Sequence, residues 1–251
     1  MKIAAWLVHI FTASGLLAGF MGLLSAIDGD YRMAMFWMLA TLIIDGIDGT
    51  FARMAKVSEV LPHVSGKTID YVIDFFTYAI LPAYLFYVAI DMDYWPRLLC
   101  CFAMLMSAAI YYGLEGMVSE GGKHFIGFPV LWNMVMYVLI FVTPGLPDWA
   151  LITIIVALSV LHFVPVHFAY PSRGGRWWGL TLTATGLFIV SAGMNVWYHP
   201  EPHPFWRYVC LGTVAYYGVL AVVDTREAWE NKGATDEVGV HAERSRGTGA
   251  G

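Results

Sequence analysis

Charge is scarce in this chain. Of its 251 residues, 13% are Asp, Glu, Lys or Arg, and 59% are hydrophobic. In a typical soluble domain about a quarter of the residues are charged, so an ordinary soluble protein is excluded. The composition instead predicts an all-α, polytopic membrane protein. The few lysines and arginines are scattered, which excludes a basic surface for nucleic acid.

Cysteine is nearly absent as well. Cys100, Cys101 and Cys210 all lie in apolar stretches, and their spacing does not match a metal site. We expect them to be small buried hydrophobic residues. The sequence shows no obvious internal repeat and no second soluble domain.

Long apolar runs are abundant. Eight stretches are predicted to be membrane-spanning helices in one helical bundle; they lie near residues 6–27, 33–54, 68–90, 97–117, 126–143, 149–169, 178–197 and 205–225. We therefore expect an integral membrane domain over residues 1–230. Residues 231–251 are polar and Gly-rich without periodicity, and are predicted to form a disordered tail.

Basic residues predict the orientation. With a cytoplasmic N-terminus, the opposite side receives only Arg32, Arg97 and Arg207 of the 14 lysines and arginines. This positive-inside bias places both termini in the cytoplasm and the 54–67 connection on the same side. In a bacterium the membrane would be the inner, cytoplasmic membrane.

Four aspartates interrupt this apolar sequence. Asp45, Asp48, Asp70 and Asp74 fall in two consecutive predicted spans. A carboxylate near the bilayer centre costs roughly 2.5–3.5 kcal/mol on insertion scales, so four of them need a compensating partner. Two divalent cations would neutralise the four charges.

The spacing of the aspartates indicates how they could share ions. Asp45 and Asp48 are three residues apart, and Asp70 and Asp74 are four apart, so each pair lies on one helix face. Two adjacent antiparallel helices could bring the faces together. Hard carboxylate oxygens favour Mg²⁺ or Mn²⁺ over zinc, and paired metals typically hold a phosphoryl group for in-line displacement.

The motif resembles the signature of the CDP-alcohol phosphotransferases. It reads Asp45-x-x-Asp48-Gly49-x-x-Ala52-Arg53, followed by Gly66-x-x-x-Asp70-x-x-x-Asp74. The twelve-residue gap between Arg53 and Gly66 is longer than the usual spacer of that family. Further stretches, 9–15, 74–78 and 125–133, are similar to the bacterial phosphatidylcholine synthase subfamily.

This resemblance implies a reaction and a set of roles. The enzyme would join choline to CDP-diacylglycerol, releasing CMP, with two Mn²⁺ or Mg²⁺ ions. Four residues, Asp45, Asp48, Asp70 and Asp74, would bind the metals, and Asp74 would also be the general base. The cytidine diphosphate group would be bordered by Asp45, Gly49, Ala52, Arg53 and Gly66. The family also suggests a homodimer.

Choline recognition requires aromatic faces and a nearby carboxylate, because a quaternary ammonium cannot donate hydrogen bonds. The candidates are Tyr71, Tyr78, Tyr111, Tyr112, Glu115 and Trp132. Aromatic residues are also common at membrane interfaces, so an anchoring role stays open for each of them. A phosphorylated acceptor would need several basic residues in the pocket. Few lysines and arginines are available on that side of the membrane, which favours an unphosphorylated alcohol.

Two alternatives stay open at this stage. Phosphatidylserine synthase, or another CDP-diacylglycerol-dependent phosphatidyltransferase, would use the same donor with a different acceptor. Intramembrane carboxylates could also belong to an ion or proton transporter. A transporter would spread them over several helices, whereas these aspartates cluster on two consecutive spans.

Overall fold

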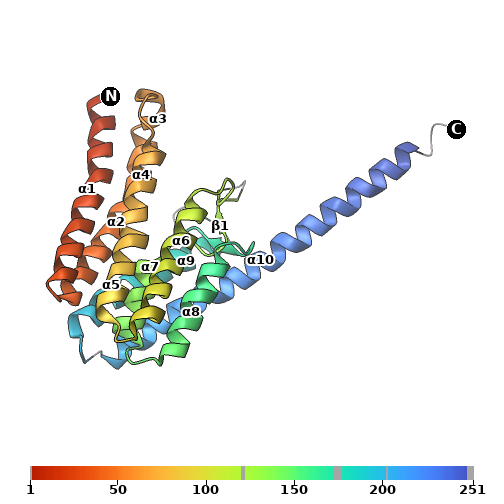
Figure 1. Ribbon diagram of the computed structural model, residues 1–251. Helices are drawn as coiled ribbons and strands as arrows, with labels where there is room; N and C mark the ends of the chain where they lie inside the picture. The colour runs from red at the N-terminus through yellow and green to blue at the C-terminus, as the bar shows by residue number, and fades with distance from the viewer. Residues whose placement is uncertain (1, 120–121, 172–173, 175–176, 202, 248–251) are drawn as a thin grey trace.

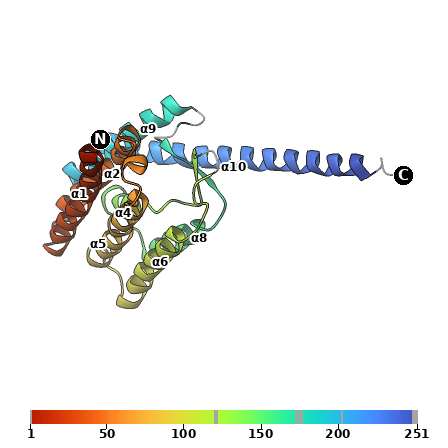
Figure 2. The same ribbon diagram turned by 90° about the horizontal axis from the view of Figure 1, so that it is seen from above.

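A computed structural model of the protein describes residues 2–119, 122–171, 174, 177–201 and 203–247. Its elements are almost entirely helical, as predicted for an all-α membrane protein. Helices stand side by side in a bundle, and α10 extends beyond it (Figure 1). Figure 2 shows the same projection of α10 from above.

Six helical segments are long and apolar enough to cross a membrane. Five are α1 (Lys2–Ile27), α2 (Tyr31–Met54), α6 (Tyr94–Tyr112), α9 (Trp178–Tyr198) and the stretch Pro204–Glu230 of α10 (Pro204–Gly247). The sixth, Gly66–Ala89, joins α4 (Gly66–Asp74), the π-helix η1 (Phe75–Ile80) and α5 (Leu81–Ala89). The proposed domain boundary at residue 230 stays a prediction: α10 continues past it to Gly247, and residues 248–251 lie outside the described part of the chain.

The other two predicted spans are shorter than expected. The stretch 126–143 contains α7 (Trp132–Tyr137) and the π-helix η2 (Val138–Val142), and the stretch 149–169 contains α8 (Asp148–Leu161). Hydropathy does not distinguish a short helix with an apolar strand before or after it from one continuous span. In addition, Pro165 lacks an N–H and disfavours helix at the residue before it, so α8 cannot continue to residue 169.

A small antiparallel β-ribbon replaces the ends of those two predicted helices. It pairs β1 (His124–Ile126) with β2 (His167–Ala169), with Phe125 opposite Phe168. Just after β1, Gly127 has a φ of +82°, and a Cβ there would lie 2.0 Å from the carbonyl oxygen of His162. Only glycine permits this close approach of the two loops.

Close packing of α1 positions the aspartate-bearing helices. Helix α1 packs along α2 and against α4, and the three lie side by side in Figure 1. A Cβ at Gly19 would come within 2.8 Å of Thr77 Cγ2, so the glycine lets α1 approach η1 closely. The two spans that carry the aspartates are therefore held by a third helix.

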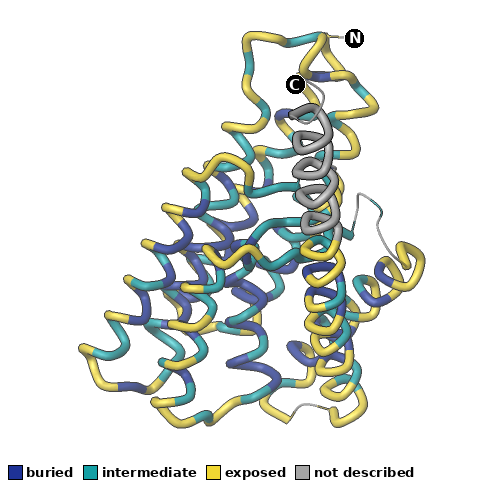
Figure 3. Tube along the Cα trace, turned by 90° about the vertical axis from the view of Figure 1, so that its right-hand side faces the viewer, coloured by how far each residue is buried: buried dark blue, intermediate teal, exposed yellow. Residues whose placement is uncertain are grey.

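The core lies inside the bundle and outward surfaces are apolar. Met35, Leu85, Phe86 and Trp132 are fully buried. Many large hydrophobic residues on the outer helix faces are exposed, as expected for surfaces that contact lipid. Figure 3 shows the buried residues in dark blue and the exposed residues in yellow along the trace.

Candidate active site

The aspartates come together between α2 and α4. Asp45 of α2 and Asp70 and Asp74 of α4 each offer a carboxylate oxygen, and these three oxygens lie within 4.8 Å of one another. Asp48, which is buried, lines the same small cavity. The spacing on each helix thus produces facing acidic side chains, which is the juxtaposition the sequence predicts.

The cavity between these carboxylates is small and mostly closed by packed side chains. Its volume is about 10 Å³, close to the least that one water-sized species needs. Besides the four aspartates, it is lined by Thr12, Gly15, Thr41, Ile44, Ile73 and Thr77. Two ions would require the side chains to move apart.

The cluster fits a hard divalent cation. Oxygens bound to one Mg²⁺ at about 2.1 Å lie up to about 4.2 Å apart, so small side-chain shifts bring three carboxylates into range. Among the described residues, no lysine or arginine forms an ion pair with the four aspartates. Their negative charge therefore needs another source of compensation.

Tyr78 holds one of the carboxylates. Its hydroxyl donates a hydrogen bond to Asp45 Oδ2 at 2.9 Å, and the ring is buried. This places a predicted choline candidate next to a metal-ligand candidate. Tyr78 lies in η1, which begins directly after Asp74. Such wide turns are frequent at functional sites, and the apolar pattern of the sequence gave no sign of this one.

The spacer between the two aspartate-bearing spans forms its own short helix. Residues between Arg53 and Gly66 contain α3 (Val57–Val60), which contacts α1 and α2. The Ser65 side chain then accepts a hydrogen bond from the Thr68 N–H and caps α4. The additional spacer residues are accommodated without disturbing the register of either aspartate pair.

The predicted nucleotide-binding residues have differing surroundings. Arg53 is exposed, and its Nη2 donates to Thr50 Oγ1 at 3.0 Å. A Cβ added at Gly49 would meet only Arg53 within 4 Å, so the space beside it is open. Ala52 is half-buried. Gly66 differs, because a Cβ there would lie 3.3 Å from the imidazole of His9, so this glycine serves helix packing.

Three of the choline candidates form an aromatic cluster beside the aspartates. The ring centroids of Tyr71 and Tyr112 are 5.4 Å apart, and those of Tyr111 and Tyr112 are 6.5 Å apart. Phe75 also packs edge-on against Tyr112. Lys67 Nζ lies 5.2 Å from the Tyr71 centroid, so this ring already accepts a cation on its face.

The other two candidates lie elsewhere. Trp132 is fully buried and packs against Phe128 and His162. Glu115 is exposed in the turn after α6. Two residues that the sequence reasoning did not assign to the site, Thr12 and Gly15, line the acidic cavity; both fall within the stretch 9–15 that contributed to the resemblance.

An apolar groove runs along the other side of α4. Its volume is about 500 Å³, and it is lined by Leu16, Thr68, Tyr71, Val72, Phe75, Phe76 and Ile80. Val72 and Ile80 are exposed, so the groove opens on the outer surface of the bundle. A carboxylate-lined cavity and an apolar groove thus share one helix.

Several known proteins are similar in sequence to most of this chain. No protein-family model matches the chain. Phosphatidylcholine synthase of Brucella melitensis is 35% identical over 213 residues, which cover 85% of this chain and 76% of that protein. The phosphatidylcholine synthase of Rhizobium meliloti is 38% identical, covering 85% and 86%. That of Pseudomonas aeruginosa is 29% identical, covering 91% and 94%. The chain belongs to the phosphatidylcholine synthase family.

Proposed function

We propose that this protein transfers the phosphatidyl group of CDP-diacylglycerol to the hydroxyl of choline, releasing CMP. The convergence of Asp45, Asp70 and Asp74 carries the proposal, because it supplies a carboxylate site of the kind that phosphoryl transfer uses. When bound, two Mn²⁺ or Mg²⁺ ions would stabilise the negative charge on the transferring phosphoryl group and on the leaving phosphate.

The side chains divide the chemistry between them. The choline oxygen forms a bond to the phosphorus that carries the diacylglycerol, and the bond from that phosphorus to the bridging oxygen of CMP breaks, its electron pair leaving with CMP. Asp74 accepts the hydroxyl proton, since an alcohol is a poor nucleophile until it is deprotonated. Tyr78 fixes Asp45. Exposed Arg53 and the open space at Gly49 would receive the diphosphate.

The acceptor would approach from the tyrosine side. A quaternary ammonium at the faces of Tyr71 and Tyr112 would lie near Asp70 and Asp74, and it would replace the Lys67 ammonium there. Tyr111 supports Tyr112 from behind. Glu115 stays a candidate from the sequence alone, because it is exposed in the turn after α6 and lies outside the tyrosine cluster. In contrast, the position of buried Trp132 favours a packing role.

The apolar groove would hold the acyl chains of the donor. It borders α4 directly and opens on the outer surface of the bundle. A lipid in the bilayer could slide into it sideways while its polar head reaches the aspartates. Its lining is apolar apart from Thr68 and the Tyr71 hydroxyl, so it suits hydrocarbon chains.

Two further features belong to this proposal. The positive-inside bias supports cytoplasmic termini and an active site facing the cytoplasm of a bacterial inner membrane. The homodimer suggested by the family is also retained, and the molar mass of the protein in detergent, measured by light scattering, tests it.

An acceptor assay tests the reaction. Purified protein receives CDP-diacylglycerol and Mn²⁺ with choline, with serine or with no acceptor, and CMP and lipid product are measured. We expect CMP and phosphatidylcholine only in the reaction that contains choline. Release of CMP with serine alone would replace the proposed acceptor. Cation flux without CMP release under any condition would instead support a transporter.

A further inference from the structure

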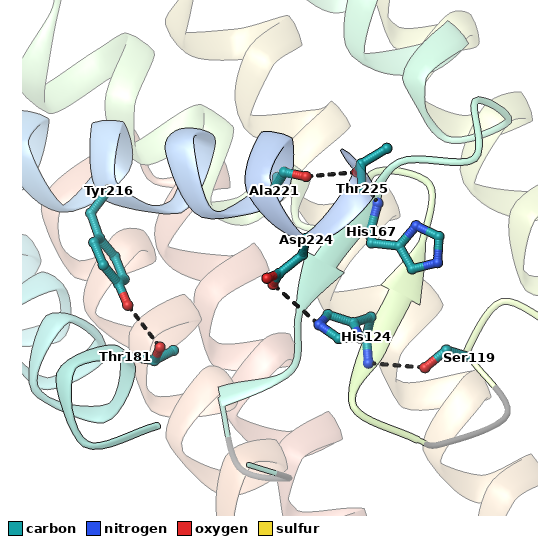
Figure 4. Close-up of polar contacts among 8 residues, drawn as sticks. All are labelled: Ser119, His124, His167, Thr181, Tyr216, Ala221, Asp224 and Thr225. Atoms are coloured by element: carbon teal, nitrogen blue, oxygen red, sulfur yellow. Dashed lines mark hydrogen bonds and ion pairs between the residues drawn. The ribbon is translucent and has the colours of Figure 1, made fainter. Parts of the chain in front are cut away.

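A second buried carboxylate lies on α10, outside the acidic cluster. The side chain of Asp224 is only 5% exposed. Its Oδ2 lies 3.1 Å from Nε2 of His124, which is the first residue of β1 and 100 positions away in the chain (Figure 4). Burying a carboxylate without a partner costs free energy, so this pair favours the position in which the ribbon rests on α10.

The second strand is tied to the next residue of α10. The backbone N–H of His167 donates to Thr225 Oγ1 at 2.8 Å, and the Thr225 hydroxyl donates to the Ala221 carbonyl (Figure 4). The rings of His124 and His167 face each other edge-on, with centroids 5.8 Å apart. Both strands of the ribbon are therefore held at one turn of α10.

The far side of the ribbon reaches the tyrosine cluster. The carbonyl of Ile126, the last residue of β1, accepts a hydrogen bond from the Tyr111 hydroxyl at 3.0 Å. The Ile126 N–H donates to the Met117 carbonyl, and Met117 Sδ lies 3.7 Å from the Tyr71 hydroxyl. Tyr71 directly follows Asp70, so contacts continue from Asp224 to the edge of the acidic cluster.

We propose that Asp224 and His124 are positioning residues for the acceptor: they lock the ribbon on α10 so that Met117 and Ile126 hold Tyr71 and Tyr111 in place. This inference rests on the proposed function, since it assigns the tyrosines to choline. Neither residue touches the reacting atoms. A loosened ribbon disorders the acceptor side while leaving the carboxylates on α2 and α4 where they are.

The variants Asp224→Asn and His124→Gln test this. Each is expected to raise the KM for choline by about 5- to 20-fold. The KM for CDP-diacylglycerol should stay within about twofold, and kcat should fall less than the KM rises. Amide hydrogen exchange in residues 117–119 and 122–126 should become faster. The matched control is Glu230→Gln, which breaks the exposed Arg226–Glu230 ion pair on the same helix and should change none of these quantities.

The exchanged pair, Asp224→His with His124→Asp, provides the rescue. Restored contact should return the KM for choline toward that of the unaltered protein. Single variants that match the unaltered protein in choline KM overturn the proposal. The proposal is also overturned if the KM for choline, the KM for CDP-diacylglycerol and kcat all worsen together in the single variants. The same holds if neither the single variants nor the exchanged variant fold, because the pair is then purely structural. Failure of the proposed function is distinct: the unaltered protein would then release no CMP with choline.

Discussion

The protein contains carboxylates in two opposite settings. Asp45, Asp70 and Asp74 face one another, and no lysine or arginine of the described chain is paired with them. Asp224 is more deeply buried than these three and has the imidazole of His124 at 3.1 Å. A paired carboxylate is satisfied within the protein, whereas the described residues give the acidic cluster no basic partner. The contrast supports the proposal that the cluster binds a ligand, whereas the Asp224–His124 pair holds an element in place.

The largest difference should appear in turnover. Asp74→Asn removes the proposed base with almost no change of shape, and general-base catalysis contributes about 100- to 10,000-fold. We expect kcat for CMP formation to fall by that factor. Asp224→Asn should lower kcat far less. The comparison breaks if both variants lose kcat equally, or if Asp74→Asn turns over normally while remaining folded in detergent.

Metal should stabilise only one of the two settings. A divalent ion that binds the folded cluster adds about 2.7 kcal/mol to the free energy of unfolding at 100 times its Kd. Thermal unfolding in detergent should therefore shift upward with Mn²⁺ and return with EDTA. Asp224→Asn should retain the full shift. Loss of the Mn²⁺-induced shift in the double variant Asp45→Asn with Asp70→Asn would locate the ion at the cluster. A shift that persists in this double variant would place the ion elsewhere.

Tyr78 offers a finer probe of the cluster. Tyr78→Phe deletes the hydrogen bond to Asp45 and keeps the buried ring. Partners behind a metal ligand typically contribute 10- to 100-fold in metal affinity. We expect the Mn²⁺ concentration for half-maximal activity to rise about tenfold, with kcat at saturating Mn²⁺ little changed. An unchanged Mn²⁺ dependence would show that Asp45 needs no such support.

The smallest effect concerns the acceptor. Tyr112→Leu keeps an apolar side chain but removes the aromatic face beside Tyr71. Because a cation–π contact contributes about 0.5–2 kcal/mol, the KM for choline should rise roughly threefold to tenfold. Tyr208→Leu, at an outward position of α10 that is 73% exposed, is the matched control. An equal response in both variants would remove Tyr112 from the choline site.

Local periodicity explains how much of this the sequence could predict. Aspartates three or four residues apart share a helix face wherever a helix forms, so the meeting of Asp45, Asp70 and Asp74 followed from spacing and antiparallel packing. The outer faces of the long spans followed from hydropathy. In both cases the information lies within a single element or between two consecutive ones.

Long-range contacts explain what could not be predicted. The ribbon joins residues 124–126 to 167–169, and its support on α10 comes from Asp224 and Thr225. No local pattern signals these pairings, and β2 and the last residue of β1 were assigned to spans. The contact of Tyr78 with Asp45 depends in turn on a wide helical turn whose residues have no distinctive pattern.

The β-ribbon also constrains the threading of the chain through the bilayer. Since β1 and β2 are hydrogen-bonded to each other, the backbone leaves the ribbon and returns to it at the same depth relative to the bilayer. The intervening residues 127–166, with α7, η2 and α8, can therefore cross only an even number of times. This parity rule is independent of hydropathy thresholds, and it ties the two short helices into a single re-entrant or hairpin unit.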